Sequence, residues 1–245
     1  MATSSMHAPP GRTFEFRVGD VFGRSFEVFT RHFILFFVLT LVPSVPLLVL
    51  PFIPPEAFAS TFVIGLAGFL LVFVCGMLAS AAVTYGVVQD LRGRPFTFSE
   101  SLAVALRRLL PLLGVSFCFG FMAMLGMILL VIPAFIVMCV YYIAPQACVV
   151  ERKGVFASLS RSAALTKGHR WRILGIVIVL MLVNIAVGYV LGLVLAGLST
   201  VAALVTGAWQ VLAGAFSAVL GAVLYFQLRS VKEGFELDQI VSVFD

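Results

Sequence analysis

The side chains that could carry chemistry in this chain are few and scattered. Its three histidines, His7, His32 and His169, are dispersed along the sequence and match neither a metal site nor a catalytic triad. The four cysteines lack CxxC spacing and lie in apolar stretches, where a thiol is typically a small buried apolar side chain: Cys75, Cys118, Cys139 and Cys148. We therefore expect no catalytic residue, no metal site, no cofactor and no enzymatic activity.

Arginine is the residue type whose placement suggests binding. Several arginines lie beside long apolar stretches or on amphipathic segments, where a guanidinium attracts anionic lipid by about 1 kcal/mol. The candidate lipid contacts are Arg24, Arg31, Arg107, Arg108, Arg170 and Arg172. The requirement to keep basic loops on one side of a membrane would place the same residues there, and this alternative stays open.

Small and neutral polar residues mark the apolar stretches themselves. Asn184 is followed by Gly188 and Gly192 at four-residue spacing. A second set recurs every seven residues and consists of Gly207, Gly214 and Gly221. Such residues let helix backbones approach closely. They are expected either to pack helices within one bundle or to form the seam of a homo-oligomer.

The composition requires that membrane helices carry these residues. Of the 245 residues, 62% are hydrophobic and only 11% are charged, whereas a soluble domain carries roughly 25% charged residues. A soluble core of this size cannot hide so much apolar surface. The net charge of +5 does not indicate nucleic-acid binding, because the basic residues form no separate basic domain.

Three long stretches that almost lack charge predict the number of spans. They cover residues 33–89, 109–150 and 173–228, and each is about twice as long as the roughly 20 residues that cross a bilayer. A reversal is expected within each stretch, at residues 51–56, at Pro133 with the two residues before it, and at 197–200. The predicted spans are 33–52, 60–89, 110–131, 133–150, 172–195 and 204–228. A single kinked helix over 110–150 is the alternative for the second stretch.

The basic residues predict the orientation. All 16 lysines and arginines lie in the segments that flank these hairpins, which are 1–32, 90–108, 151–172 and 229–245. Because basic residues favour the cytoplasmic side, this pattern places both termini there and requires an even number of crossings in each stretch. Residues 1–13 are expected to form a disordered tail without a signal peptide, and 14–245 a single membrane domain.

A charged amphipathic segment precedes each hairpin. The first has a stripe of Phe22, Phe26, Phe29 and Phe33, and the second has Leu102, Leu106, Leu109 and Leu113. The third segment, 155–166, is weaker. We expect ion pairs Asp20–Arg24 and Glu27–Arg31 in the first segment, a capping box of Thr97 and Glu100 in the second, and Gly168 to end the third. Residues 236–245 are expected to form a short final interfacial helix.

The pattern of several short segments resembles uncharacterised bacterial membrane proteins similar to the membrane domain fused to some glycerophosphoryl diester phosphodiesterases. The segments are 18–21, 143–145, 149–151, 154–156, 162–168, 225–229 and 232–235. The resemblance covers about residues 14–240 and implies a six-helix fold in a bacterial inner membrane. The matching residues include Ser162, Gly168, Arg229, Glu233 and Gly234. A structural role suffices for each, as a cap, a turn glycine or part of an Arg229–Glu233 pair at i, i+4 spacing. No catalytic residue is implied, because the phosphodiesterase domain has no counterpart.

The sequence thus predicts an all-α polytopic membrane protein of six transmembrane helices, arranged as three hairpins that each follow a cytoplasmic amphipathic interfacial helix. The expected function is non-enzymatic and consists of organising membrane lipids or a protein partner. One alternative is a transporter or permease component for an apolar or amphipathic solute. The other is a membrane subunit of a lipid-headgroup enzyme.

Overall fold

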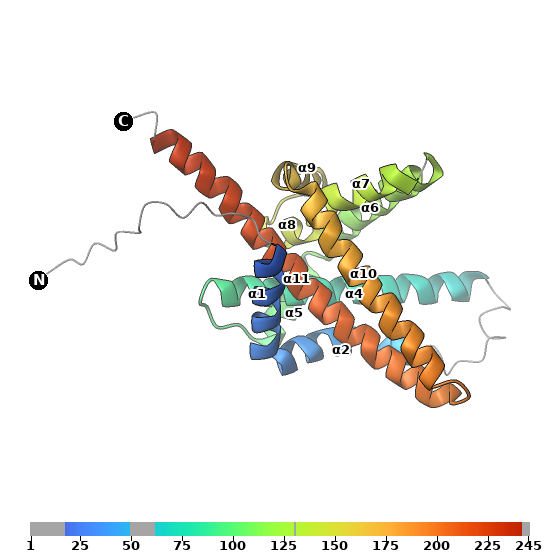
Figure 1. The fold of residues 1–245 in the computed structure, drawn as a ribbon. Helices are drawn as coiled ribbons and strands as arrows, with labels where there is room; N and C mark the ends of the chain where they lie inside the picture. Colours follow the sequence, from blue (N-terminus) through green and yellow to red (C-terminus); the bar gives the residue numbers. More distant parts are fainter. Residues whose placement is uncertain (1–17, 50–61, 130, 242–245) are drawn as a thin grey trace, which may run out of the picture.

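The chain is built from α-helices (Figure 1). A computed structural model describes residues 18–49, 62–129 and 131–241, and these residues contain no strand. Their helices are α1 (Val18–Arg31), α2 (Phe33–Val49), α4 (Phe62–Leu91), α5 (Phe98–Arg107), α6 (Leu109–Leu129), α7 (Val131–Tyr141), α8 (Ala144–Glu151), α9 (Val155–Thr166), α10 (Arg170–Val194) and α11 (Ser199–Val241).

Several of these helices are long and apolar enough to cross a membrane. Within the described residues there are five candidate spans: Gly65–Leu91, Leu109–Ile128, Pro133–Glu151, Arg170–Val194 and Thr200–Glu233. The count becomes six if α1 and α2, which meet at an angle of 85°, form one broken span. The protein is therefore a multi-pass α-helical membrane protein.

The chain reverses direction within the second apolar stretch. A Cβ atom built on Gly126 of α6 would lie 2.9 Å from the Cα atom of Ala134 in α7. Residues eight apart in one continuous helix are separated by about 12 Å along its axis, so α6 and α7 pack side by side instead of forming one kinked helix. Pro133 lies in the first turn of α7, where a missing N–H leaves no helical hydrogen bond unmade.

The third stretch reverses close to the predicted position. Helix α10 ends at Val194 and α11 begins at Ser199, with Gly197 between them at φ +91°. Glycine adopts this left-handed backbone without a steric penalty. Helix α11 continues unbroken to Val241. The prediction of a separate interfacial helix over 236–245 is therefore wrong for residues 236–241, and the remaining residues lie outside the described chain. The first predicted reversal, at residues 51–56, lies outside the described residues.

The segments before the apolar stretches form helices α1, α5 and α9. Some of the predicted caps and ion pairs of these helices are observed. The Oγ1 atom of Thr97 accepts the backbone N–H of Glu100 at 3.3 Å and caps α5. Gly168 follows the end of α9 at φ +90°, as predicted. The Arg31–Glu27 pair forms at 2.6 Å. Among the described residues no ion pair joins Asp20 to Arg24, because Arg24 extends away from its own helix into a pocket.

The buried face of α1 includes only part of its predicted phenylalanine stripe. The protein buries Val21, Ser25, Val28 and Phe29, whereas Phe26 is 62% exposed. On α5 the buried residues are likewise Ser101 and Ala105, one position before the predicted leucine stripe. One position corresponds to a rotation of about 100° around the helix. Both helices therefore have an apolar face that packs on the protein and a second apolar face that does not.

The buried core occupies one end of the helix bundle. Helix α11 runs through the molecule and contacts α1, α2, α4, α8, α9 and α10. Its residues Ala218–Tyr225 are buried, but Val201 and Leu204 near its start are exposed. In α10 the buried residues are Ile173, Ile176 and Val177, all near its first turn. Most of the core thus lies at the end that carries the basic connectors, whereas away from that end α10 and the start of α11 leave apolar side chains exposed.

Candidate functional site

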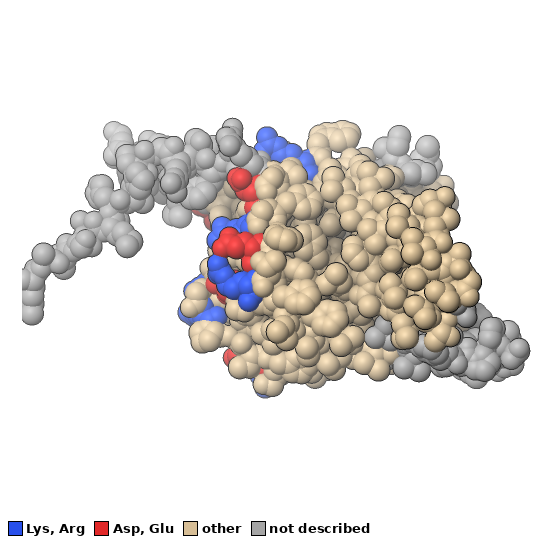
Figure 2. Space-filling model, turned by 60° about the horizontal axis from the view of Figure 1, so that its bottom comes forward, with Lys and Arg blue, Asp and Glu red and all other residues tan. Residues whose placement is uncertain are grey.

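The charged segments of the chain meet at one end of the molecule, which we call the basic end. It comprises residues 18–32, 90–108, 151–172 and 229–233. Direct contacts link each segment to the next along the chain: His32 to Asp90, Arg108 to the carbonyl oxygen of Arg152, and Arg161 to Glu233. Figure 2 shows charged side chains gathered over this end, while the rest of the visible face is free of them.

Asp90 fixes the bend between α1 and α2. Its Oδ1 lies 2.8 Å from the Nε2 atom of His32, the residue at the bend, and its Oδ2 lies 3.9 Å from Arg31. The His32 ring also makes an edge contact with Phe96, at 5.2 Å between ring centroids. A Cβ on Gly86 would lie 2.6 Å from Phe96, so this aromatic ring packs directly on the backbone of α4. These contacts hold the 85° bend against the end of α4.

A buried carboxylate joins α8, α9 and α11. The side chain of Glu151 is only 8% exposed. Its Oε1 accepts hydrogen bonds from Arg161 Nε and the Tyr225 hydroxyl, each at 2.7 Å, and its Oε2 lies 2.6 Å from Lys153 Nζ. Three partners therefore satisfy one buried charge, as such a charge requires.

Arg161 extends this arrangement to a second carboxylate. It also pairs with Glu233, whose Oε2 accepts from Arg229 Nε at 2.7 Å. The Arg229–Glu233 pair was expected and is confirmed. Burial alone would lower the pKa of the Arg161 guanidinium, but its bonds to Glu151 and Glu233 raise it above the usual range. We call this set of residues the Glu151 clasp: Glu151, Lys153, Arg161, Tyr225, Arg229 and Glu233.

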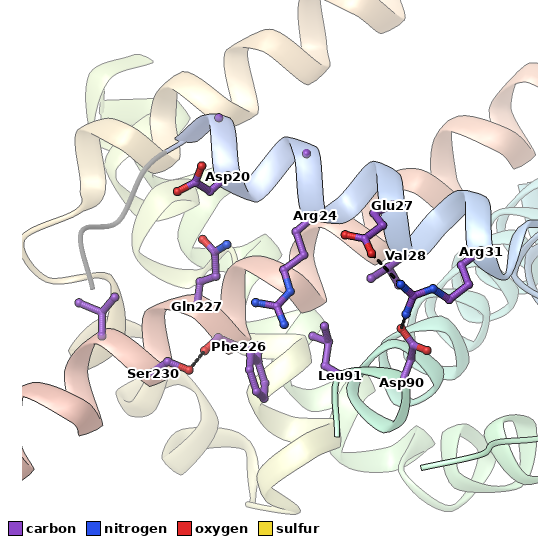
Figure 3. A pocket seen from close by; sticks show the side chains of 13 residues that line it. Asp20, Arg24, Glu27, Val28, Arg31, Asp90, Leu91, Phe226, Gln227 and Ser230 are labelled. Atoms are coloured by element: carbon purple, nitrogen blue, oxygen red, sulfur yellow. Dashed lines mark hydrogen bonds and ion pairs between the residues drawn. The ribbon is translucent and has the colours of Figure 1, made fainter. Parts of the chain in front are cut away.

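A polar pocket of about 830 Å³ lies between α1, the end of α4 and α11 (Figure 3). Figure 3 shows Arg24 extending from α1 into this space, towards the α11 residues Phe226 and Gln227. Arg24 has no ion-pair partner among the described residues, although Asp20 and Glu27 also line the pocket. The pocket therefore presents one unneutralised guanidinium among groups of both signs.

An apolar groove of about 570 Å³ lies between α7 and α10. Its walls include Phe135 and Ile136 from α7 and Leu174 and Ile178 from α10. Arg170, the first residue of α10, lines the groove as its one charged residue. Trp171 beside it is 85% exposed. The groove thus combines an apolar wall with a cation at the end where α10 leaves the basic connector.

The structure places the six candidate arginines in different surroundings. Arg24 and Arg170 line the two pockets just described, and Arg31 pairs with Glu27. Arg108 donates to the carbonyl oxygen of Arg152 at 3.3 Å. Arg107 and Arg172 are exposed on the surface of the basic end. The predicted residues share this end of the molecule, but they do not form one site.

The small residues of α10 do not pack within the described chain. The side chain of Asn184 donates to the carbonyl oxygen of Leu180, in its own helix, at 2.9 Å. A Cβ on Gly188 or Gly192 would meet no atom within 4 Å. For Asn184 and these glycines the predicted packing inside the bundle is therefore not observed. The alternative, a seam between copies of the chain, stays a prediction.

The small residues of α11 differ along the helix. A Cβ on Gly221 would lie 2.5 Å from the side-chain nitrogen of Gln146 in α8, which confirms close packing there. A Cβ on Gly214 would reach Thr40 at an ordinary contact distance of 3.8 Å. Gly207 is half-buried. Only the end of this series that lies in the core needs glycine for the approach of another helix.

Thr84 and Asn184 are two polar residues that could line a path for a solute, and each forms a hydrogen bond within its own helix. Thr84 donates to the carbonyl oxygen of Ser80 at 2.8 Å, as Asn184 does to that of Leu180. Groups of three or more metal-binding side chains do not occur among the described residues. The four cysteines are free thiols, of which Cys139 and Cys148 are buried.

The sequence did not reveal the ion-pair partners of Asp90 and of the residues in the Glu151 clasp. The residues of the Glu151 clasp come from segments 72 to 74 positions apart, and a charge pattern along one helix reveals only pairs such as Arg229–Glu233. Asp90 and Glu151 each lie at the end of an apolar stretch, next to basic residues. That position is the one signal by which they could have been recognised.

One family matches the sequence in the comparisons with known proteins. The family is described as a domain of unknown function (DUF7847), and it matches residues 69–229, which is more than half of the chain. No curated protein and no solved structure matches the chain. An uncharacterised family agrees with the prediction, whereas the resemblance to the membrane domain of glycerophosphoryl diester phosphodiesterases finds no support in these comparisons.

Proposed function

For this chain, which belongs to the DUF7847 family of unknown function, we propose the role of a non-enzymatic membrane protein that binds anionic phospholipid with its basic end. In this proposal it crosses a bacterial inner membrane six times, as three hairpins, and both termini lie in the cytoplasm. The support for the orientation is that all 16 lysines and arginines lie in the hairpin-flanking segments, as basic residues at the cytoplasmic face do.

The connector helices suit a position at the membrane surface. The exposed apolar face of α1 carries Phe26, that of α5 carries Leu106 and that of α9 carries Phe156, which is 79% exposed. Charged residues such as Glu27 and Arg31 occupy another face of α1. A helix with one face on protein, one in acyl chains and one in water is expected to lie in the plane of the interface.

The groove between α7 and α10 is the observation that carries the lipid-binding proposal. An acyl chain would lie against Phe135, Ile136, Leu174 and Ile178, and the lipid phosphate would meet Arg170. An arginine binds phosphate oxygens with two parallel hydrogen bonds. Trp171 is an aromatic residue of the kind that lies at headgroup level. The occupant is therefore a phospholipid with net negative charge.

Reconstitution tests this proposal. The full chain is placed in nanodiscs of phosphatidylcholine, with or without phosphatidylglycerol, and lipid retained after mild delipidation is measured by native mass spectrometry. Arg170→Gln removes the cation and should weaken phosphatidylglycerol retention about fivefold, which corresponds to about 1 kcal/mol. Ile136→Trp fills the groove and should reduce retention of either lipid there.

Each variant has a matched control. Lys167→Gln removes an exposed charge close to Arg170 in sequence but outside the groove, and Phe117→Trp enlarges a residue of α6 that is 75% exposed. Neither control should change lipid retention. Equal retention of both lipids by the wild type, or an equal loss in Lys167→Gln and Arg170→Gln, would contradict the proposal.

A further inference from the structure

A second arginine-rich pocket lies at the basic end, between the end of α4, the turn that follows it, α5 and α8. Its volume is about 200 Å³. Three arginines, Arg92, Arg94 and Arg152, line it together with Tyr85 and Gln89, and valines form the rest of the wall. No acidic residue is part of this lining. The pocket shares no residue with the groove between α7 and α10.

Ion pairs with described residues do not neutralise the positive charge of this pocket, although Arg92 also lines a cavity that contains Glu233, the partner of Arg161 and Arg229. None of its three arginines forms an ion pair with a described residue. The nearest acids in sequence are Asp90 and Glu151, and both have other partners: Asp90 contacts His32 at 2.8 Å, and Glu151 belongs to the clasp with Arg161. Arg108, which donates to the backbone of Arg152, brings a further positive charge close to the pocket.

Arg152 occupies a backbone position that favours glycine. It follows the last residue of α8 at φ 54°, the left-handed conformation, and it is the one non-glycine residue with positive φ in the described chain. Glycine adopts this conformation without the clash that a Cβ introduces. Glycine would thus adopt this backbone more easily than the arginine that occupies it, whose side chain lines the pocket.

Gln89 contributes a side-chain amide of which one polar atom has no hydrogen-bond partner among the described residues. Its amide nitrogen donates to the Tyr85 hydroxyl at 2.7 Å, while its buried amide oxygen has no partner among the described residues. If the amide turns over, the Tyr85 O–H donates to that oxygen and the NH₂ group becomes the one without a partner. A proton acceptor bound in the pocket would satisfy this NH₂ group.

From these observations we propose that the Arg92, Arg94 and Arg152 pocket binds a phosphate group. Its guanidinium groups supply paired donors for phosphate oxygens. The phosphate can belong to an anionic lipid of the inner leaflet or to a soluble phosphate compound, since both present the same oxygens. The site does not depend on the lipid groove at Arg170, and either can fail without the other.

Two experimental arms distinguish the sources. In the first, the full chain in phosphatidylcholine nanodiscs is titrated with inorganic phosphate at constant ionic strength. In the second, the buffer contains no inorganic phosphate, and the phosphatidylcholine nanodiscs contain increasing fractions of phosphatidic acid. Melting temperature, followed by tryptophan fluorescence, should rise to saturation in at least one arm. A rise only with inorganic phosphate identifies a soluble ligand, and a rise only with phosphatidic acid identifies a lipid.

Three variants locate the effect. Arg152→Gly and Arg94→Gln should each weaken the apparent affinity at least about tenfold, as expected for lost hydrogen bonds to a charged group. Without phosphate, Arg152→Gly should melt at or above the wild-type temperature, because glycine suits φ 54°. Lys167→Gln changes an exposed basic residue that does not line the pocket and should behave as the wild type.

The proposal fails if the melting temperature shows no saturable rise in either arm. It also fails if Lys167→Gln loses the rise as completely as Arg152→Gly and Arg94→Gln, since the effect would then be unspecific charge attraction. Arg94 lies in a turn between helices, so Arg94→Gln decides the question even if Arg152→Gly does not fold.

Discussion

The two ends of this protein are held together by different means. At the basic end, helices from the whole chain bury apolar side chains such as Leu224 and tie buried charges such as Glu151 to several partners. At the opposite end, α10 leaves Ile185 and Leu193 exposed, and Leu193 is 60% exposed. The same residue types thus serve as core at one end and as outer surface at the other.

The difference follows from the solvent. Lipid chains are about as apolar as leucine, so an apolar helix surface gains little by leaving lipid for protein. Where water is scarce, an ionised group that loses its partner is left as an uncompensated charge, which is strongly destabilising. We therefore expect the fold to depend on the basic end, and the apolar end to tolerate substitution. Four experiments test this comparison.

The largest effect is expected at the Glu151 clasp. Glu151→Gln removes the buried carboxylate and leaves the half-buried Arg161 with one carboxylate instead of two. Removal of one partner from a fully buried pair costs about 3–5 kcal/mol, and partial exposure of Arg161 places the expected loss near the lower of these values. Unfolding free energy in mixed detergent micelles, followed by titration with sodium dodecyl sulfate, measures the loss. Glu27→Gln breaks an exposed pair, with side chains 55% and 64% exposed, and should cost at most about 1 kcal/mol. Equal losses would refute the distinction between the two ends.

The next effect compares the same substitution at the two ends. Leu224→Ala opens a cavity at a fully buried position and should cost about 2 kcal/mol, near the low end for such changes, because lipid already solvates leucine well in the unfolded state. Leu193→Ala should change stability by less than about 0.5 kcal/mol. Chemical unfolding of both variants measures the difference. A loss at Leu193 as large as at Leu224 would indicate that the apolar end is packed as well.

Two glycines sharpen the comparison at smaller scale. Gly221→Ala forces a Cβ to within 2.5 Å of Gln146, and overpacking of this kind costs about 1–3 kcal/mol. The double variant with Gln146→Ala should recover most of the loss. Gly192→Ala adds a Cβ in open space and should stabilise α10 by up to about 1 kcal/mol. Thermal melting separates these cases, and a lower melting temperature for Gly192→Ala would point to a helix from another copy at that face.

The smallest effect concerns pH. Burial lowers the pKa of His169 below its usual 6.5, and the charges of Lys232 and Arg172 lower it further. The unfolded chain therefore takes up a proton at higher pH than the folded chain. The contribution of the neutral His169 ring to stability is fully present well above pH 6.5. This contribution is lost as the pH falls towards the pKa of His169 in the folded chain. His169→Gln should reduce the fall in melting temperature between about pH 7.5 and about pH 5.5. An unchanged fall would exclude His169 as its cause.

The sequence predicted well those features that depend on position along the chain. Charge-free lengths predicted the apolar helices. Pro133 and Gly197 marked reversals because proline cannot continue a helix interior and glycine readily adopts the left-handed backbone. Local pairs such as Arg229–Glu233 followed from helical spacing. The first reversal and the number of crossings by α1 and α2 were not settled in this way, because α2 has only 17 residues and meets α1 at 85°.

Features that depend on which helices meet were not predictable. Periodicity placed Phe26 and Phe29 on one apolar stripe of α1, but the protein buries Phe29 together with Val21 and leaves Phe26 exposed. In a membrane an apolar face can meet protein or lipid, and hydrophobicity does not distinguish them. The three arginines of the phosphate pocket come from two helix ends and a turn, so no spacing rule brings Arg92, Arg94 and Arg152 together.

The clasp also imposes an order on assembly. Glu233 follows Arg161 by 72 residues and Tyr225 follows Glu151 by 74, and all of α10 lies between them. During synthesis, Glu151 and Arg161 therefore reach the membrane surface long before their partners on α11 exist. We therefore expect the earlier helices to remain loosely associated in the bilayer until the last helix has been inserted. A chain truncated before Tyr225 should accordingly insert into the membrane but lack the α11 contacts of the Glu151 clasp. It should therefore be a preferred substrate for membrane proteases.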